Sequence, residues 1–243
     1  MPISIVRCAI VIPARMASTR FPGKPLVDLC GKPMVQWVVE AANASGIAER
    51  VLVATPDDEI LAACESFGAE AIRTRLDHPS GTDRLAEVAE SVHADVYVNV
   101  QGDEPLVPPE TIRACAAPLL ADSSVEMGSV CAPCPEEEWE NPAVVKVVTA
   151  LNGDALYFSR WSIPFPRNTR SVKKHLGLYA FRRDVLQRFA TWPMSPLETA
   201  ESLEQLRFLE NGVRIRMSEG EGSALAVDTP EQAEQVRAIL NLK

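Results

Sequence analysis

The chain enters its first loop through IVIPARMASTRFPGK, residues Ile10–Lys24. The apolar run from Ile3 to Ile12 predicts a buried first strand. The polar residues after this run include small side chains, which let backbone N–H groups approach phosphate oxygens, while Arg15, Arg20 and Lys24 supply positive charge. A loop of this kind at the carboxyl end of a buried strand indicates a site for a polyanion.

The same loop lacks the two common phosphate-binding patterns. The P-loop pattern needs a glycine, four residues and then Gly-Lys-Ser/Thr, and the dinucleotide pattern needs three spaced glycines. Neither is present, so the residues predict a nucleotide site of another kind. An ordinary polar connection between a strand and a helix is the structural alternative, because Arg and Lys are common on protein surfaces.

Composition limits the partners that such a site could have. The chain has 243 residues, of which 47% are hydrophobic and 23% charged, and its net charge is −9. This predicts a globular protein with a sizeable core and argues against a general surface for nucleic acid or anionic membrane. A phosphate site must then be a local basic cluster, helped by a metal ion. No membrane span or export signal is recognisable, so we expect a cytoplasmic protein.

The six cysteines are scattered, which predicts reduced thiols rather than a disulfide framework. Cys131 and Cys134 have CxxC spacing. A zinc site would need a second pair of ligands, and a redox site would need the pair at a helix start. The prolines at 133 and 135 instead indicate a loop, so packing is the favoured role of both thiols.

Strand and helix patterns alternate along the first half of the chain. Strands are expected at 5–12, 50–54, 69–73 and 96–100, and helices at 34–44, 57–67 and 80–92, with Ser80 or Thr82 as N-cap. Such units predict an α/β fold with a mostly parallel sheet between two layers of helices. Ligands bind beyond the carboxyl ends of the strands in such sheets. The segments 13–24, 77–84 and 101–105 are expected to meet there.

The pattern becomes richer in strands after Leu120. Strands are expected at 125–132, 144–150 and 174–181, and a loop at 163–173. Helices are expected at 183–190 and 197–211, then strands at 214–217 and 224–227, and a last helix capped by Thr229 with Pro230 at its first position. We therefore expect a single domain over residues 1–243, with an inserted β-rich subdomain at about 125–181 whose strands lack obvious partners in the main sheet.

Two aspartates follow apolar runs at predicted strand ends. Asp103 lies in Gln101-Gly102-Asp103-Glu104-Pro105, and Asp228 lies in Val227-Asp228-Thr229-Pro230. Two carboxylates from separate strand ends, with phosphates and water, would hold Mg²⁺. Asp103 could instead form a turn, and Asp228 could simply begin the last helix.

These segments together resemble the 3-deoxy-manno-octulosonate (Kdo) cytidylyltransferases, also called CMP-Kdo synthetases. The resemblance runs from near residue 3 to the last helix and rests on IPARMASTRFPGKPL from Ile12, DHPSGTDRLAEV from Asp77, VNVQGDEPL from Val98, ALYFSR from Ala155, KHLGLYAFRRD from Lys174, SPLETAESLEQLR from Ser195 and VDTPE from Val227. Arg-x-x-Ser-Thr-Arg-x-Pro-Gly-Lys marks the wider group of sugar cytidylyltransferases. The LEQLR, KHLG and YFSR segments indicate the Kdo branch.

The resemblance implies a nucleotide site and a reaction. CTP would be bound by Ala14, Arg15, Ser18, Lys24, Ser80, Gly81, Arg84, Gln101 and Gly102. The implied catalytic residues are Arg15, Lys24, Asp103 and Asp228, with Mg²⁺ on the two aspartates. The anomeric hydroxyl of the sugar acid would attack the α-phosphate and expel pyrophosphate. Such phosphoryl transfer rests on positioning and electrostatics and needs no covalent nucleophile.

The acid sugar would be bound, by the same resemblance, by Gln101, Arg160, His175, Tyr179, Glu204 and Gln205. Each could instead have a structural role: a surface ion pair for Arg160, one shared strand face for His175 and Tyr179, and a solvated helix surface for Glu204 and Gln205. The resemblance also implies a homodimer. The short connection from Arg160 to Lys174 is similar to that of capsule-pathway relatives, so the lipopolysaccharide and capsule pathways both stay open. Transfer to 8-amino-Kdo or a sialic acid, and a non-catalytic nucleotide-binding relative, are the alternative functions.

Overall fold

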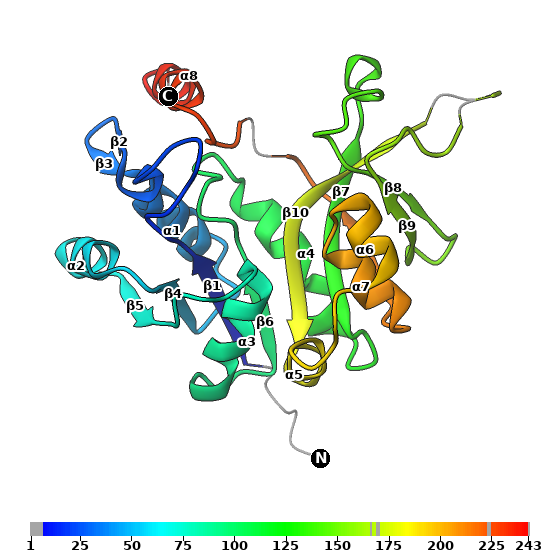
Figure 1. Ribbon diagram of the computed structural model, residues 1–243, viewed down its shortest axis with the longest axis horizontal. Helices are drawn as coiled ribbons and strands as arrows, with labels where there is room; N and C mark the ends of the chain where they lie inside the picture. The colour runs from blue at the N-terminus through cyan, green and yellow to red at the C-terminus, as the bar shows by residue number, and fades with distance from the viewer. Residues whose placement is uncertain (1–6, 166, 169–170, 223–224, 243) are drawn as a thin grey trace.

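The computed structural model describes residues 7–165, 167–168, 171–222 and 225–242 (Figure 1). A nine-stranded sheet runs through it in the order β11-β7-β10-β6-β1-β4-β5, and β8 and β9 extend from β10. The bounds of these strands are β1 Cys8–Pro13, β4 Arg50–Thr55, β5 Glu70–Arg73, β6 Val96–Asn99, β7 Met127–Pro133, β8 Lys146–Thr149, β9 Ala155–Ser159, β10 Lys173–Arg182 and β11 Ile215–Glu219. The α/β fold with a mostly parallel sheet is confirmed.

The strand β1 explains why the sheet is covered on both faces. Its side chains alternate between two hydrophobic clusters, with Ala9 and Val11 in one and Cys8, Ile10 and Ile12 in the other. A strand with apolar side chains on both faces can be satisfied only when both faces are covered. The helices α3 (Gly81–Ser91), α5 (Arg183–Phe189) and α7 (Gln205–Glu210) cover the first face, and α1 (Met34–Ala44), α2 (Asp58–Ser66) and α4 (Pro109–Ala121) cover the second.

One strand of the main sheet runs against its neighbours. β10 is antiparallel to β6 and to β7, whereas β1 is parallel to β4 and β6, and β11 is parallel to β7. Tyr179 of β10 pairs with Asn99 near the end of β6, so the first residues of β10 continue past that end. There β10 pairs with β7 and β8, and its register with β7 shifts between Leu176 and Tyr179. The overhanging part of β10 therefore lies beside the carboxyl ends of the parallel strands.

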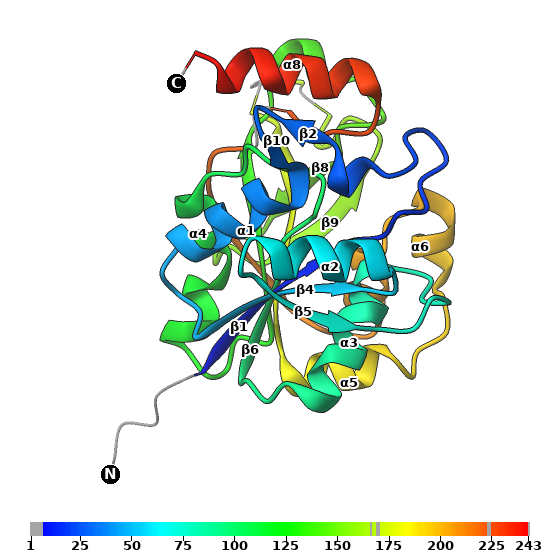
Figure 2. The same cartoon turned by 90° about the vertical axis from the view of Figure 1, so that its left-hand side faces the viewer.

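The last helix, α8 (Pro230–Leu240), closes one end of the molecule. It packs beside the two-stranded ribbon of β2 (Asp28–Leu29) and β3 (Lys32–Pro33), as Figure 2 shows. Leu29, Met34, Val227, Ala233 and Val236 form the small core beneath it. Thr229 and Gln232 form the capping box at its start, which confirms the predicted helix start at Pro230.

Strand pairing corrects the expectation that the strands of the 125–181 region lack partners in the main sheet. The two strands β7 and β10 are integral to the main sheet, and the β8–β9 hairpin is the part of the 125–181 region that extends from it (Figure 1). The strand predictions failed to anticipate these partners because β7 pairs with β10 and β11, which follow it far along the chain. Among the described residues, no helix combines the length and apolar character needed to cross a membrane.

Several local predictions also differ from the structure. The helix expected at 197–211 is two helices, α6 (Pro196–Glu201) and α7, because Ser202 adopts a left-handed conformation with φ of 52°. The strand expected at 224–227 is absent over residues 225–227, and residue 224 lies outside the described residues. The helix α4 and the strand β9 were not predicted. The first strand begins at Cys8 in the described part, and residues 3–6 lie outside it.

Candidate active site

A cavity of about 360 Å³ lies at the carboxyl ends of β1 and β6 and at the start of α3. Its walls come from the three segments that were expected to meet, together with Pro25 and Asp228. The lining residues are Pro13, Ala14, Arg15, Ala17, Ser18, Thr19, Arg20, Lys24, Pro25, His78, Pro79, Ser80, Gly81, Arg84, Gln101, Gly102, Asp103 and Asp228. All nine residues predicted to bind CTP are among them, as are both predicted metal ligands.

The ammonium group of Lys24 lies between the two aspartates. Its Nζ donates hydrogen bonds to Asp103 Oδ2 at 2.7 Å and to Asp228 Oδ1 at 3.0 Å. Arg20 Nη2 lies 2.9 Å from the other oxygen of Asp228. Burial lowers the pKa of the Lys24 ammonium, but the two carboxylates outweigh burial and raise it overall. Lys24 is therefore a fixed positive charge at the floor of the cavity.

Backbone pairing brings Asp228 beside Asp103. The N–H of Val227 donates to the carbonyl of Asp103 at 2.8 Å, which aligns the segment before α8 with the loop after β6. The hydroxyl of Thr229 caps α8, so the side chain of Asp228 is not needed as the helix cap. Asp228 thus follows an extended segment rather than a strand, yet its carboxylate reaches the same point as that of Asp103.

These two carboxylates suit a hard divalent cation. Oxygens from both converge on the single Nζ of Lys24, so they are close enough to share one ion after a local rearrangement. No group of three His, Cys, Asp or Glu side chains able to hold a metal occurs among the described residues. Mg²⁺ keeps several waters and binds through one or two carboxylates plus substrate phosphates. The donor set therefore fits Mg²⁺ brought together with a nucleotide.

The start of α3 forms another part of the cavity wall. Ser80 is the N-cap, and its hydroxyl accepts a hydrogen bond from the N–H of Asp83. The positive end of this helix faces the cavity through Ser80 and Gly81. Arg84 is buried on the same helix and donates to the Thr74 hydroxyl and the Arg75 carbonyl. Burial, and then the positive charge of Arg15, lower the pKa of the Arg84 guanidinium.

Gly102 allows two loops to cross at the floor of the cavity. A Cβ atom on this residue would lie 2.7 Å from the carbonyl oxygen of Pro13, which is too close for any side chain. The loop after β6 can pass directly over the end of β1 only with glycine here. This close approach holds Gln101 and Asp103 against the loop that contains Arg15 and Lys24.

The residues predicted to bind the acid sugar lie on a neighbouring set of elements. Gln101 lines the cavity, and its Nε2 donates to the carbonyl of Gly177 in β10 at 3.3 Å. Arg160, His175, Tyr179, Glu204 and Gln205 do not line the cavity. His175 and Tyr179 are on β10, with ring centroids 5.3 Å apart, while Glu204 and Gln205 begin α7.

His175 is held as a neutral imidazole. Its Nε2 lies 2.9 Å from the hydroxyl of Ser129, and that hydroxyl donates its own proton to the carbonyl of Leu178. The imidazole must therefore donate from Nε2, which leaves Nδ1 as an acceptor. Burial lowers the pKa of His175 to about 3. The residue can accept a hydrogen bond from a sugar hydroxyl at neutral pH.

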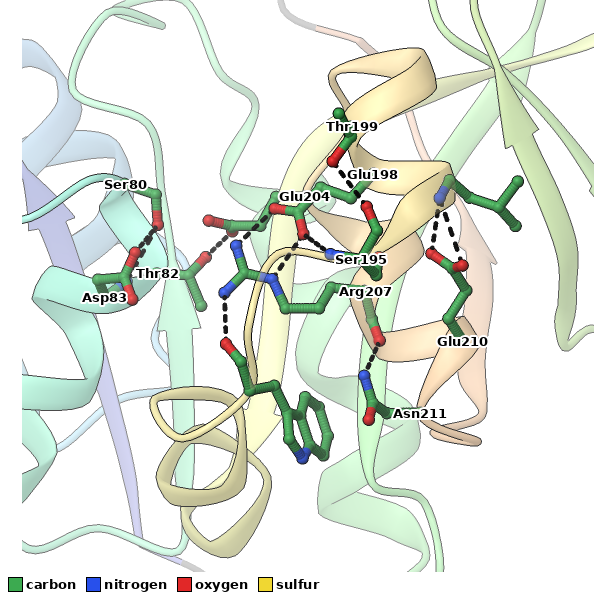
Figure 3. Close-up of polar contacts among 12 residues, drawn as sticks. Ser80, Thr82, Asp83, Ser195, Glu198, Thr199, Glu204, Arg207, Glu210 and Asn211 are labelled. Carbon is green, nitrogen blue, oxygen red and sulfur yellow. Dashed lines mark hydrogen bonds and ion pairs between the residues drawn. The ribbon is translucent and has the colours of Figure 1, made fainter.

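Polar contacts fix the side chains at the start of α7. The hydroxyl of Tyr179 donates to Gln205 Oε1 at 3.1 Å, and the Nε2 of Gln205 is buried without a partner. The hydroxyl of Thr82 donates to Glu204 Oε1, as Figure 3 shows. An amide N–H₂ that is buried and unpaired is costly unless a ligand supplies an acceptor.

Arg160 is bound mainly to backbone carbonyl groups. Its guanidinium donates to the carbonyls of Glu201, Ser202 and Pro142 at 2.7, 3.2 and 2.9 Å. The left-handed turn at Ser202 directs two of these carbonyls toward it. A guanidinium has five N–H groups, so two are left over for an anion.

Three titratable groups in or outside the cavity were not singled out from the sequence. His78 lines the cavity and pairs with Glu87 of α3. Glu104 is next to Asp103, and burial together with that neighbour raises its pKa to about 7. Lys146 is buried, and its ammonium donates to the carbonyls of Asn141, Val144 and Arg160. Glu104 could have been noticed because it directly follows Asp103. No local sequence pattern marks His78 or Lys146 as unusual.

The cysteines are free thiols in the structure. Cys131 and Cys134 are both buried, and burial raises the pKa of each thiol. Cys131 is in β7 and Cys134 follows the end of that strand, rather than opening a helix.

Comparison with known proteins identifies the family of the chain. The family model for cytidylyltransferases matches residues 9–215. The 3-deoxy-manno-octulosonate cytidylyltransferase of Escherichia coli is 47% identical over 237 residues, covering 96% of both chains, and that of Acidobacterium capsulatum is 48% identical over 233 residues, covering 95% of both. A solved structure of CMP:2-keto-3-deoxy-manno-octonic acid synthetase complexed with CTP superimposes with a TM-score of 0.95 at 46% identity, covering 97% of this chain and 99% of the other. The chain therefore belongs to the cytidylyltransferase family, as a nucleotidyltransferase of its 3-deoxy-manno-octulosonate branch.

Proposed function

We propose that this enzyme transfers the cytidylyl group of CTP to Kdo, giving CMP-Kdo and pyrophosphate. The observation that carries the proposal is the cavity in which Lys24 and the start of α3 face the converging carboxylates of Asp103 and Asp228. The relatives at 47–48% identity bear the name of this activity.

Three groups of residues in the cavity would have separate roles in phosphoryl transfer. Ala14, Arg15, Ser18 and Lys24 would hold the triphosphate, with Arg15 and Lys24 stabilising charge on the leaving pyrophosphate. Ser80, Gly81, Arg84, Gln101 and Gly102 would hold the cytidine part. Asp103 and Asp228 would hold Mg²⁺, which would neutralise phosphate charge and acidify the attacking hydroxyl.

The sugar acid would lie between this cavity and the start of α7. The two remaining N–H groups of Arg160 suit its carboxylate. Acceptors for its hydroxyls come from Nδ1 of His175 and the carboxylate of Glu204, while the unpaired Nε2 of Gln205 is a donor. Gln101 spans both halves of the site, and Tyr179 holds Gln205 in place.

We also propose that the enzyme is a homodimer and that it is cytoplasmic, as a biosynthetic enzyme. Leu156, Trp161 and Phe165 are large apolar residues with 62%, 81% and 84% of their surface exposed. They belong to the β8–β9 hairpin and the segment after it, which Figure 1 shows on the side of the molecule opposite α2. Large apolar residues exposed along one stretch of the chain are typical of an interface. The CMP-Kdo made by this reaction would be the activated donor of Kdo for lipopolysaccharide or capsule synthesis.

The direct test is pyrophosphate release with CTP and Kdo, compared with CTP and 8-amino-Kdo or N-acetylneuraminate. We expect turnover with Kdo that requires Mg²⁺ and stops when the sugar is omitted. Faster turnover with one of the other acid sugars would reassign the substrate. Binding of CTP without turnover of any of them would favour a non-catalytic relative.

A further inference from the structure

Thr82 is a buried residue at the wall between the two halves of the site. It follows Gly81, the first residue of α3, and only 2% of its surface is exposed. Its neighbours Gly81 and Arg84 line the nucleotide cavity, whereas Thr82 does not. Its hydroxyl points from α3 to α7 and donates to Glu204 Oε1 (Figure 3).

The carboxylate that receives this hydrogen bond lies in an unfavourable place for a charge. Burial raises the pKa of the Glu204 carboxyl, and the nearby Asp83 carboxylate raises it further. The hydrogen bond from the Thr82 hydroxyl and the positive charge of Arg207 lower it, whereas the Ser80 hydroxyl donates to Asp83 Oδ2 at 2.7 Å instead. Glu204 is half-buried, and a desolvated carboxylate with few donors depends on each of them for its orientation.

The rest of the α6–α7 hairpin is anchored separately. The buried pair of Glu198 and Arg207 joins the start of α6 to α7, with Nε of Arg207 donating to Glu198 Oε2 at 2.7 Å. Arg207 also donates to the carbonyl of Trp192 at 3.4 Å (Figure 3). The hairpin is thus held without Thr82, and loss of the Thr82 hydroxyl would affect chiefly Glu204.

We infer that Thr82 is a positioning residue, which orients the Glu204 carboxylate for the acid sugar and ties the α3 wall of the nucleotide cavity to the α6–α7 hairpin. The inference rests on the proposed function of Glu204. Thr82 touches neither substrate in this arrangement; it acts through the carboxylate that it holds.

The test compares KM for Kdo with KM for CTP in matched variants. Thr82→Val removes the hydroxyl and preserves the shape, and we expect it to raise KM for Kdo about tenfold or more, as for loss of a hydrogen bond to a charged group. KM for CTP should stay within about twofold, and Thr82→Ser should restore KM for Kdo. Thr111→Val is the control, because Thr111 has the same exposure of 2% and its hydroxyl bonds to Glu221 instead.

A double-mutant cycle establishes whether Thr82 acts through Glu204. The double variant Thr82→Val with Glu204→Gln should be no worse for Kdo than Glu204→Gln alone. The inference would be overturned if the two substitutions raised KM for Kdo by factors that multiply in the double variant. It would also be overturned if Thr82→Val raised KM for CTP as much as KM for Kdo. If Thr82→Val lowers the melting temperature strongly, Thr82→Ala takes its place in the same cycle. Absence of any turnover by the unmodified enzyme would instead contradict the proposed function.

Discussion

The ammonium group of Lys24 is hydrogen-bonded to both Asp103 and Asp228. We expect substitutions of the aspartates to affect metal binding, and substitution of the lysine to affect CTP binding. Replacing Asp103 with Asn removes a charged oxygen ligand but leaves the shape of the side chain. We expect turnover to fall by about two orders of magnitude or more, since a catalytic metal contributes several kcal/mol. Steady-state rates with Mg²⁺, and with the enzyme stripped by a chelator, measure this. The control is Asp184→Asn, an exposed residue paired with Arg188. Near-normal turnover of chelated enzyme would contradict the metal assignment.

We expect Lys24→Met to raise KM for CTP, or lower kcat/KM for CTP, far more than it changes the same parameters for Kdo. The ammonium is expected to neutralise phosphate charge, and loss of one charge-assisted contact is worth roughly 1.5–3 kcal/mol. KM and kcat for each substrate measure the difference. Lys32→Met is a suitable control, because Lys32 pairs with Glu40 instead. If CTP parameters stayed unchanged while sugar parameters collapsed, Lys24 would have another role.

His175 should make the protein less stable in mild acid. Its pKa is lowered to about 3 in the folded state, against an ordinary value of 6.5. Between these values the unfolded chain binds a proton that the folded protein does not, so the stabilisation is complete above pH 6.5 and is lost as pH falls toward 3. At pH 5 the free energy of unfolding is expected to be lower by about 2 kcal/mol than above pH 6.5.

Urea unfolding at pH 7.5 and pH 5.0 tests this expectation. His175→Gln should lose less free energy of unfolding between the two pH values than the unmodified protein does. The exposed His93 provides the control variant His93→Gln, which should follow the unmodified protein. Equal losses in all three proteins would show that His175 does not control the acid sensitivity.

Sequence could predict the residues of the nucleotide cavity but not their contacts. Arg15, Ser80 and Gln101 follow or begin predicted elements, and parallel strands bring such positions to one edge. The contact of Lys24 with Asp228 spans 204 positions, and that of Thr82 with Glu204 spans 122. Contacts at such separations depend on tertiary packing, which no local pattern encodes.

The helix α4 packs on β7 through a glycine. A Cβ atom on Gly128 would lie 2.5 Å from the carbonyl oxygen of Cys115 and 2.8 Å from Cδ1 of Leu119. Gly128→Ala should therefore push α4 away and cost about 1–3 kcal/mol of stability. Gly177→Ala on β10 is the matched control, because its Cβ would meet nothing closer than 3.8 Å. Chemical denaturation measures the free energy of unfolding of both variants. Equal values for Gly128→Ala and Gly177→Ala would contradict this packing.

Elements with regular apolar periods were predictable, and elements interrupted by special residues were not. The helix at Met34–Ala44 was predicted with its observed bounds. The helix α4 begins with Pro109 and contains Pro118, whose missing N–H argues against a helix in any local reading. The break between α6 and α7 depends on the left-handed Ser202, and Arg160 binds the carbonyls of Ser202 and of Glu201 before it, contacts that the sequence does not reveal.

At the scale of the whole molecule, the exposed apolar residues of the hairpin region predict self-association. Light scattering at micromolar concentration should give twice the mass of one chain. Trp161→Asp should give the monomer, since it places a charge in the apolar patch. The control is Leu242→Asp, which changes a similarly exposed residue near the carboxyl end of the chain and should leave the dimer intact. A fully active monomer of the unmodified protein would rule out dimerisation as a functional requirement.

The single reversed strand β10 has a mechanical consequence. One half of it is hydrogen-bonded between β6 and β7, and the other half joins β7 to the β8–β9 hairpin. Any tilt of the hairpin is therefore transmitted through one continuous backbone into the middle of the sheet. The register shift between Leu176 and Tyr179 interrupts the pairing of β10 with β7, so we expect the strand to bend there. His175 and Tyr179 lie on opposite sides of that bend, so the angle of the strand there sets the separation of their rings.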